Sequence, residues 1–328
     1  MGPLRLRSTE GETDQQEGTA MSNPTRTMST ESQCSRRTFL KLSGLTTLGV
    51  GGMTFLTGCG PAAQNAPADN SDDVDTDTAA AETLGDGKTL RVGMEAAYAP
   101  YNWQVSEASD TTIPIDNVEG GYADGYDVQI AKRIADALGM EPVAVKMDFT
   151  ALVDALNNGQ IDIICAGMSV DPDRAQSADF SDSYIDDGVA LITTKDSPYA
   201  SATSLEDFAG TSVIGQAGTI YDDVIDQIPD VNHMTPAKTV PSVVENLSNG
   251  TCDAITFSSL SVPQLLKNYD NFAEVQLEQG FEDATNPDNA AIAKGQEAVL
   301  AKINEVIGGI SQEEREQLWN DCMDRQPA

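Results

Sequence analysis

Short apolar runs alternate, beyond the first ninety residues, with segments that repeat apolar side chains every three or four positions. The run at 161–166 is almost continuously apolar and rich in isoleucine, which is typical of a strand buried in a parallel sheet. A segment with Ile130, Ile134 and Leu138 on one face reads as a helix that ends at Gly139. Strands that alternate with helices predict an α/β fold.

Polar residues gather where the strand at 161–166 is expected to end. Gly167 breaks the apolar run, and the pair Asp171-Pro172 then suits the start of a helix. Arg174 therefore lies near a junction of strand and helix, where open α/β sheets bind ligands. Its planar guanidinium matches a carboxylate, although pairing with a neighbouring aspartate at the surface is the alternative.

The segment from Asn158 to Tyr184 carries a longer motif, N-G-Q-I-D-I-I-C-A-G-M-S-V-D-P-D-R, followed by D-F-S-D-S-Y. It resembles the signature of the amino-acid-binding proteins of ABC importers, the family 3 extracellular solute-binding proteins. The resemblance extends from about Leu90 to Trp319. It implies a type II periplasmic-binding-protein fold, in which two lobes, each a mostly parallel sheet flanked by helices, are joined by two hinge crossings and close around a ligand.

An ungapped internal repeat supports two related lobes. The sequences V-D-A-L-N-N-G-Q-I-D-I-I from Val153 and V-E-N-L-S-N-G-T-C-D-A-I from Val244 both read as helix, glycine and strand. A common connection that arose twice is the alternative. The expected division is an upstream segment with a signal peptide at 1–58, a disordered tether at 59–88, lobe 1 at 89–187 and 283–328, and lobe 2 at 188–282.

Export signals precede the predicted fold. The sequence S-R-R-T-F-L-K at 35–41 matches a twin-arginine signal, and the apolar segment that follows is short for a membrane span. L-T-G-C at 56–59 resembles a bacterial lipoprotein box with Cys59 as the lipidated residue. We therefore expect an exported protein, extracellular or periplasmic, that lipid on Cys59 anchors to the outer face of the cytoplasmic membrane.

Composition narrows the possible partners. Nineteen basic and 52 acidic residues give a formal net charge of −33, which argues against binding to nucleic acid or to an anionic membrane surface. Beyond the signal, Cys165, Cys252 and Cys322 are odd in number and lack C-x-x-C spacing, so neither a disulfide framework nor a zinc site is indicated. No metal or cofactor is expected.

The resemblance implies a set of ligand contacts. Glu95 would contact the ligand, Tyr98 and Phe149 would enclose its stem, and Arg174 would hold its carboxylate together with Thr219 at a helix N-terminus. The complete predicted ligand-binding set is Glu95, Tyr98, Phe149, Gly167, Met168, Ser169, Arg174, Gln216, Thr219 and Ser258.

One position departs from the family pattern. The acidic residue that receives the ligand's α-ammonium is expected five residues after Asp253, where this chain has Ser258. A hydroxyl carries no charge, so either Glu95 supplies it or the ligand is not an ordinary α-amino acid. Glu95 and the acidic surface favour a cationic amino acid.

These features predict a monomeric receptor that captures a small amino acid, closes, and delivers it to a membrane permease. The alternatives are an enzyme resembling cyclohexadienyl dehydratase and a ligand-sensing receptor on the same fold. Catalysis is disfavoured because His233 is the only histidine, no G-x-S-x-G motif is present, and no nucleophile has an evident base. We therefore expect no enzymatic activity.

Overall fold

The computed structural model describes residues 83–327. The predicted twin-arginine signal, the lipidation site Cys59 and most of the predicted tether lie outside this range. Within it, none of the helices is both long and apolar enough to span a membrane.

The end of the predicted tether belongs to the fold. Leu84 is only 2% exposed and lies in the same apolar core cluster as Leu90 and Met140. The expectation of disorder up to residue 88 was therefore wrong for these last residues. A single leucine among polar residues gave too weak a pattern to predict this packing.

Lobe 1 contains three parallel strands of a nine-stranded sheet, in the order β7-β1-β6. The first helix, α1, ends at Gly139 in the left-handed conformation, as predicted. A separate four-stranded antiparallel sheet in the order β2-β3-β5-β4 completes this lobe. The elements are β1 (Thr89–Met94), β2 (Ala97–Tyr98), β3 (Asn102–Val105), β4 (Ile113–Pro114), β5 (Tyr122–Asp124), α1 (Tyr126–Leu138), β6 (Glu141–Lys146), η1 (Phe149–Ala151), α2 (Leu152–Asn157), β7 (Ile163–Ile164), α3 (Arg174–Ser177), α7 (Glu297–Gly309) and α8 (Gln312–Arg325).

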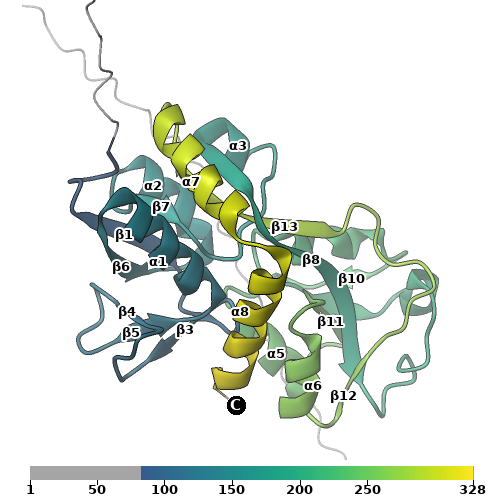
Figure 1. Ribbon diagram of the computed structural model, residues 1–328. Helices are drawn as coiled ribbons and strands as arrows, with labels where there is room; N and C mark the ends of the chain where they lie inside the picture. Colours follow the sequence, from purple (N-terminus) through teal and green to yellow (C-terminus); the bar gives the residue numbers. More distant parts are fainter. Residues whose placement is uncertain (1–82, 328) are drawn as a thin grey trace, which may run out of the picture. The chain divides into compact units, whose positions relative to one another are not determined.

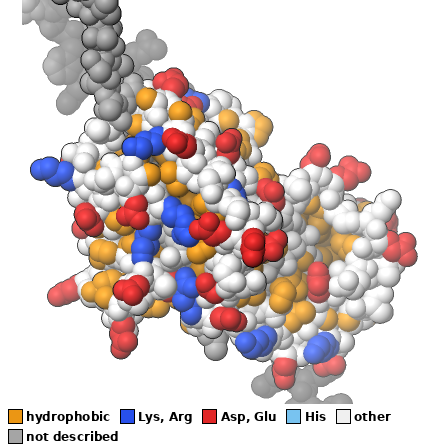
Figure 2. Space-filling model, viewed as in Figure 1, with side chains coloured by type: hydrophobic (Ala, Val, Ile, Leu, Met, Phe, Trp, Pro, Cys, Tyr) orange, Lys and Arg blue, Asp and Glu red, His pale blue; other side chains and the backbone are white. Residues whose placement is uncertain are grey.

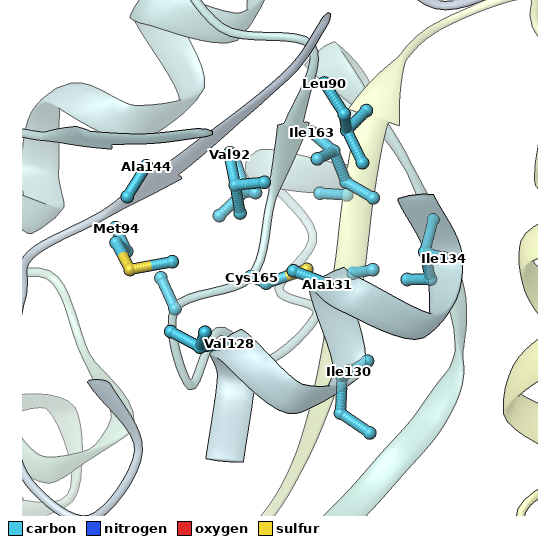
Figure 3. Close-up of a cluster of buried hydrophobic side chains, with 14 of the residues drawn as sticks. Leu90, Val92, Met94, Val128, Ile130, Ala131, Ile134, Ala144, Ile163 and Cys165 are labelled. Carbon is cyan, nitrogen blue, oxygen red and sulfur yellow. The ribbon is translucent and has the colours of Figure 1, made fainter. Parts of the chain in front are cut away.

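The core of lobe 1 lies between the sheet and its helices. Figure 3 shows side chains of β1, such as Val92, directed toward Val128 and Ala131 of α1. The predicted strand at 161–166 is shorter than expected, because only two residues form the ladder with β1. Backbone hydrogen bonds from Asp162 N to Arg91 O and from Cys165 N to Gly93 O extend the pairing at both ends.

Lobe 2 repeats this plan with parallel pairing of β9 to both β10 and β11. Both copies of the internal repeat form a helix, a glycine with a positive φ of 67° at Gly159 and Gly250, and a strand, as predicted. The elements of this lobe are η2 (Leu205–Phe208), β9 (Ser212–Ile214), α4 (Ile220–Asp223), η3 (Val224–Gln227), β10 (Asn232–His233), α5 (Val240–Ser248), β11 (Ala254–Ser258), α6 (Val262–Asn268) and β12 (Phe272–Glu274).

Two long strands join the lobes: β8 (Ala178–Thr194) and β13 (Thr285–Ala293). They pair with each other antiparallel up to Gly188, after which β8 pairs with β11. The sheet is therefore continuous from lobe 1 to lobe 2, and Figure 1 shows both strands passing between them. These are the two crossings that the fold prediction required.

Candidate ligand-binding site

An open cavity of about 600 Å³ lies between the lobes, which is large enough for an amino acid. Lobe 1 lines it with residues around η1 and α3, and lobe 2 contributes Gly218, Ile220 and Asp223. Four members of the predicted ligand-binding set line this cavity: Phe149, Met168, Ser169 and Arg174.

Arg174 combines both arrangements considered from the sequence. Its Nε lies 2.8 Å from Asp171 Oδ2, so the pairing with a neighbouring aspartate is present. The guanidinium also faces the cavity, where Nη1 donates to Ser169 O at 2.7 Å and Nη2 donates to Gly218 O across the two lobes. Its central carbon lies 5.3 Å from the ring centre of Phe149, which adds a cation–π contact. Burial lowers the pKa of Arg174.

Acidic side chains surround this arginine. Asp171, Asp173, Asp223 and Asp283 line the same cavity, and Arg174 is the one basic residue among its lining residues. Burial, followed by repulsion from Asp222, raises the pKa of Asp223. Four aspartates against one arginine give the lining an excess of acidic groups, which favours a ligand that carries a positive group in addition to its carboxylate.

Glu95 lies at a second contact between the lobes. Its Oε2 accepts a hydrogen bond of 3.0 Å from Nε2 of Gln216, whereas Oε1 is buried and has no partner. The side chain is 5% exposed. Burial raises its pKa to about 7, and the bond from Gln216 only partly offsets this effect. Glu95 thus offers an unpaired acceptor whose charge changes near neutral pH.

Tyr98 and Ser258 line a much smaller cavity of about 10 Å³, together with Gln216 and Tyr221. The hydroxyls of Tyr98 in lobe 1 and Tyr221 in lobe 2 lie 3.2 Å apart. Tyr98 also stacks on Tyr101, with ring centres 4.5 Å apart. This volume holds about one water molecule, so the lobes meet closely here.

Two further predicted residues support these contacts from the backbone. Gly167 has a φ of +58°, and a Cβ built on it would lie 3.1 Å from the Tyr98 ring. Glycine is favoured here because the conformation is strained for other residues and an added Cβ would press on the Tyr98 ring. Thr219 precedes α4, but its hydroxyl donates to Gln216 O at 2.8 Å and so is used within lobe 2.

Asp187 is a buried acidic residue that the sequence did not single out. It lies on β8 next to Ser258 of β11, and one of its oxygens accepts the Ser258 hydroxyl. The only signal was an aspartate pair before Gly188 inside a β-rich stretch. Its two oxygens accept six hydrogen bonds, from the hydroxyls of Tyr101, Tyr221, Ser258 and Ser259 and from the N–H groups of Gly188 and Leu260.

Metal and disulfide chemistry find no support between residues 83 and 327. No group of three or more histidine, cysteine, aspartate or glutamate side chains there could hold a metal ion. Cys165, Cys252 and Cys322 are buried free thiols.

Two lobes that share a continuous sheet through two crossing strands, with a cavity between them, define a type II periplasmic binding protein. The chain matches the family of bacterial extracellular solute-binding proteins, family 3, over residues 90–320, and it belongs to that family. The motif at Asn158–Tyr184 therefore identified the family correctly. The fold class that the resemblance implied is confirmed as well.

Several known proteins are similar to this chain. A probable histidine-binding protein of Neisseria gonorrhoeae is 26% identical over 70% of this chain and 80% of its own length. The arginine-binding extracellular protein ArtP of Bacillus subtilis is 27% identical over 67% of this chain and 76% of its own. A crystal structure of the substrate-binding protein of an amino acid ABC transporter superposes with a TM-score of 0.62 at 27% identity, covering 72% of this chain and all of that one.

An enzyme is also among the relatives. The cyclohexadienyl dehydratase of Pseudomonas aeruginosa is 28% identical, but over only 40% of this chain and 44% of the enzyme. The match is partial, whereas the binding proteins are similar over most of their length.

Proposed function

We propose that this protein is the receptor of an ABC importer that captures a cationic amino acid between its lobes and delivers it to a membrane permease. Two relatives of the same family are named for histidine and arginine, both amino acids with basic side chains. The observation that carries the proposal is the placement of Arg174 in a cavity that four aspartates, Asp171, Asp173, Asp223 and Asp283, also line. Such a cavity suits a carboxylate and a second, positive group on one small molecule.

Each predicted residue has a role in this proposal. Arg174 and Ser169 hold the ligand carboxylate, and Phe149 and Tyr98 enclose the stem. The unpaired oxygen of Glu95 receives a positive group of the ligand. Gly167 and Met168 shape the wall, while Gln216, Thr219 and Ser258 contribute from lobe 2. Closure about β8 and β13 would bring these two sets together around the ligand.

The predictions about export, lipid anchoring and domain division are part of the same proposal. Export through the twin-arginine signal and lipid on Cys59 would keep a monomeric receptor at the outer face of the cytoplasmic membrane. The division into a signal segment, a tether, lobe 1 in two parts and lobe 2 is also part of this proposal. Acidic side chains are spread over the face shown in Figure 2, as suits an exported surface rather than a nucleic-acid-binding one.

Calorimetric titration tests the proposal directly. The protein is stripped of bound solute by unfolding and refolding, and is then titrated with the common amino acids, ornithine and prephenate. We expect micromolar or tighter binding of arginine, histidine or a related cation and weaker binding of glutamate. If none of the amino acids binds, the proposal is refuted.

A dehydratase is the second candidate, because one observation favours it. The pKa of Glu95 is raised to about 7, a value that suits a general acid at neutral pH. Incubation with prephenate at millimolar concentration, followed by ultraviolet detection of the aromatic product, distinguishes the two functions. Turnover that Glu95→Gln abolishes would establish the enzyme.

A further inference from the structure

Asp187 occupies the point at which β8 changes partners. Its own neighbour on β13 is Asn286, and two residues further on Val189 pairs with Ser258 of β11. Asp187 therefore belongs to the junction of the lobes and lies beside the position where the family pattern has an acidic residue and this chain has serine.

The carboxylate of Asp187 is surrounded by neutral hydrogen-bond donors. Its oxygens accept the six hydrogen bonds described above. The side chain is 6% exposed, and none of the ion pairs formed within residues 83–327 includes it. No basic side chain therefore neutralises this buried carboxylate, which leaves it available to balance a positive group brought near it.

The Asp187 carboxylate also determines which way the neighbouring hydroxyls donate their protons. A hydroxyl has one proton to donate and two lone pairs to accept with. Tyr221 gives its proton to Asp187 at 3.2 Å. The 3.2 Å contact between Tyr221 and Tyr98 is then made with the Tyr98 proton. The Tyr98 oxygen then presents its lone pairs toward the small cavity that Tyr98 lines with Tyr221 and Ser258.

We propose that Asp187 supplies the negative charge that balances the ligand's α-ammonium group, in place of the carboxylate that Ser258 lacks. It acts as a positioning residue through Tyr221, Tyr98 and Ser258, whose oxygens form the wall that the ammonium meets. The inference rests on the proposed function, since it assigns one more role in binding an amino acid. It resolves the choice left by the sequence, because an ordinary α-amino acid no longer requires Glu95 for its α-ammonium.

The first test compares two ligands on one variant. The probes are the amino acid that binds the wild-type protein most tightly, with L-arginine expected, and its α-hydroxy analogue, which keeps the carboxylate and side chain. Asp187→Asn should weaken binding of the amino acid at least about tenfold and that of the hydroxy analogue by less than about threefold. A purely structural role would weaken both probes equally, and that result would overturn the inference.

Asp186→Asn is the matched control, because Asp186 is the exposed neighbour of Asp187 on the same strand. It makes the same change in net charge while its side chain points to the opposite face. We expect its affinity for both probes to stay within about twofold of wild type, since exposed charges interact weakly.

Rescue provides a test that a folding defect cannot imitate. Ser258→Asp alone should weaken binding, because it places a second carboxylate beside Asp187. The double variant Asp187→Asn with Ser258→Asp should bind the amino acid within about threefold of wild type, which makes the two changes strongly non-additive. Additive losses in the double variant would overturn the inference. Failure of the wild-type protein to bind any amino acid would instead overturn the proposed function, and the inference with it.

Discussion

Arg174 and Asp187 carry opposite charges at the junction of the lobes, and the protein holds them in different surroundings. Arg174 faces an open cavity of about 600 Å³ and is already paired with Asp171. Asp187 is buried next to a cavity of about 10 Å³, and its partners are hydroxyls and backbone N–H groups. An open charge can exchange partners when a ligand arrives, whereas a buried one acts by orienting the groups around it.

Of the changes considered, replacing Arg174 in the open cavity should reduce ligand affinity most. Arg174→Ala removes a charged, forked donor and the contact with Phe149, so we expect affinity for an amino acid to fall at least about a hundredfold, on the order of 3 kcal/mol. Calorimetry measures the loss. Arg133→Ala, which removes a surface pair with Glu314 and a hydrogen bond to Gln129 O far from the cavity, is the control and should bind normally.

Changing pH should add or remove charge at Glu95, a third charged residue between the lobes, and so change the stability of the ligand-free protein. Burial raises its pKa from 4.5 to about 7, so the folded protein holds this proton more tightly than the unfolded chain does. Its contribution to stability is complete below pH 4.5 and declines as pH rises through 7, by on the order of 2 kcal/mol in the ligand-free protein.

Urea unfolding at pH 5 and pH 7.5 measures this contribution. Glu95→Gln carries no titrating group and should lose less stability than wild type between the two values. Affinity for a cationic amino acid should rise over the same interval, since Glu95 gains its charge. An identical pH response in the two proteins would show that Glu95 does not titrate there.

Gly167 connects the two sides, because it precedes Met168 and Ser169 of the open cavity and contacts Tyr98 of the closed one. Gly167→Ala should cost about 1–2 kcal/mol from the positive φ alone. Displacement of Tyr98 should add a loss of binding. Gly139→Ala is the matched control, since it has a φ of +69° with open space around it. Equal stability and affinity in the two variants would argue against the close contact.

Replacing acidic residues that line the open cavity should have the smallest effect on ligand binding. Asp173→Asn combined with Asp283→Asn should lower the association rate of a cationic amino acid about twofold at low salt, and less at high salt. Stopped-flow fluorescence measures the rate. Asp136→Asn with Asp321→Asn makes the same change in net charge on α1 and α8 and should leave the rate unchanged.

The sequence predicted the open side of the site better than the closed side. Arg174 and Ser169 lie within six residues of each other after one strand, so local pattern was enough to place them together. Asp187, Tyr221 and Ser258 come from three separate segments that meet only through the pairing of β8 with β11. Such long-range hydrogen bonds leave no periodic signal. The ligand-binding roles of the predicted residues remain predictions.

The division of lobe 1 between two separate stretches of the chain also has a consequence for the order in which the chain folds. The strands and helices of lobe 2 come from one uninterrupted stretch, whereas the core of lobe 1 joins Leu90 and Val92 to Ile303, Ile307 and Cys322. Contacts so distant in sequence form late, because the intervening loop must be closed first. During synthesis lobe 2 can therefore fold while lobe 1 still waits for α7 and α8. Deleting α8 would leave the later-made lobe intact and the earlier-made one unfinished.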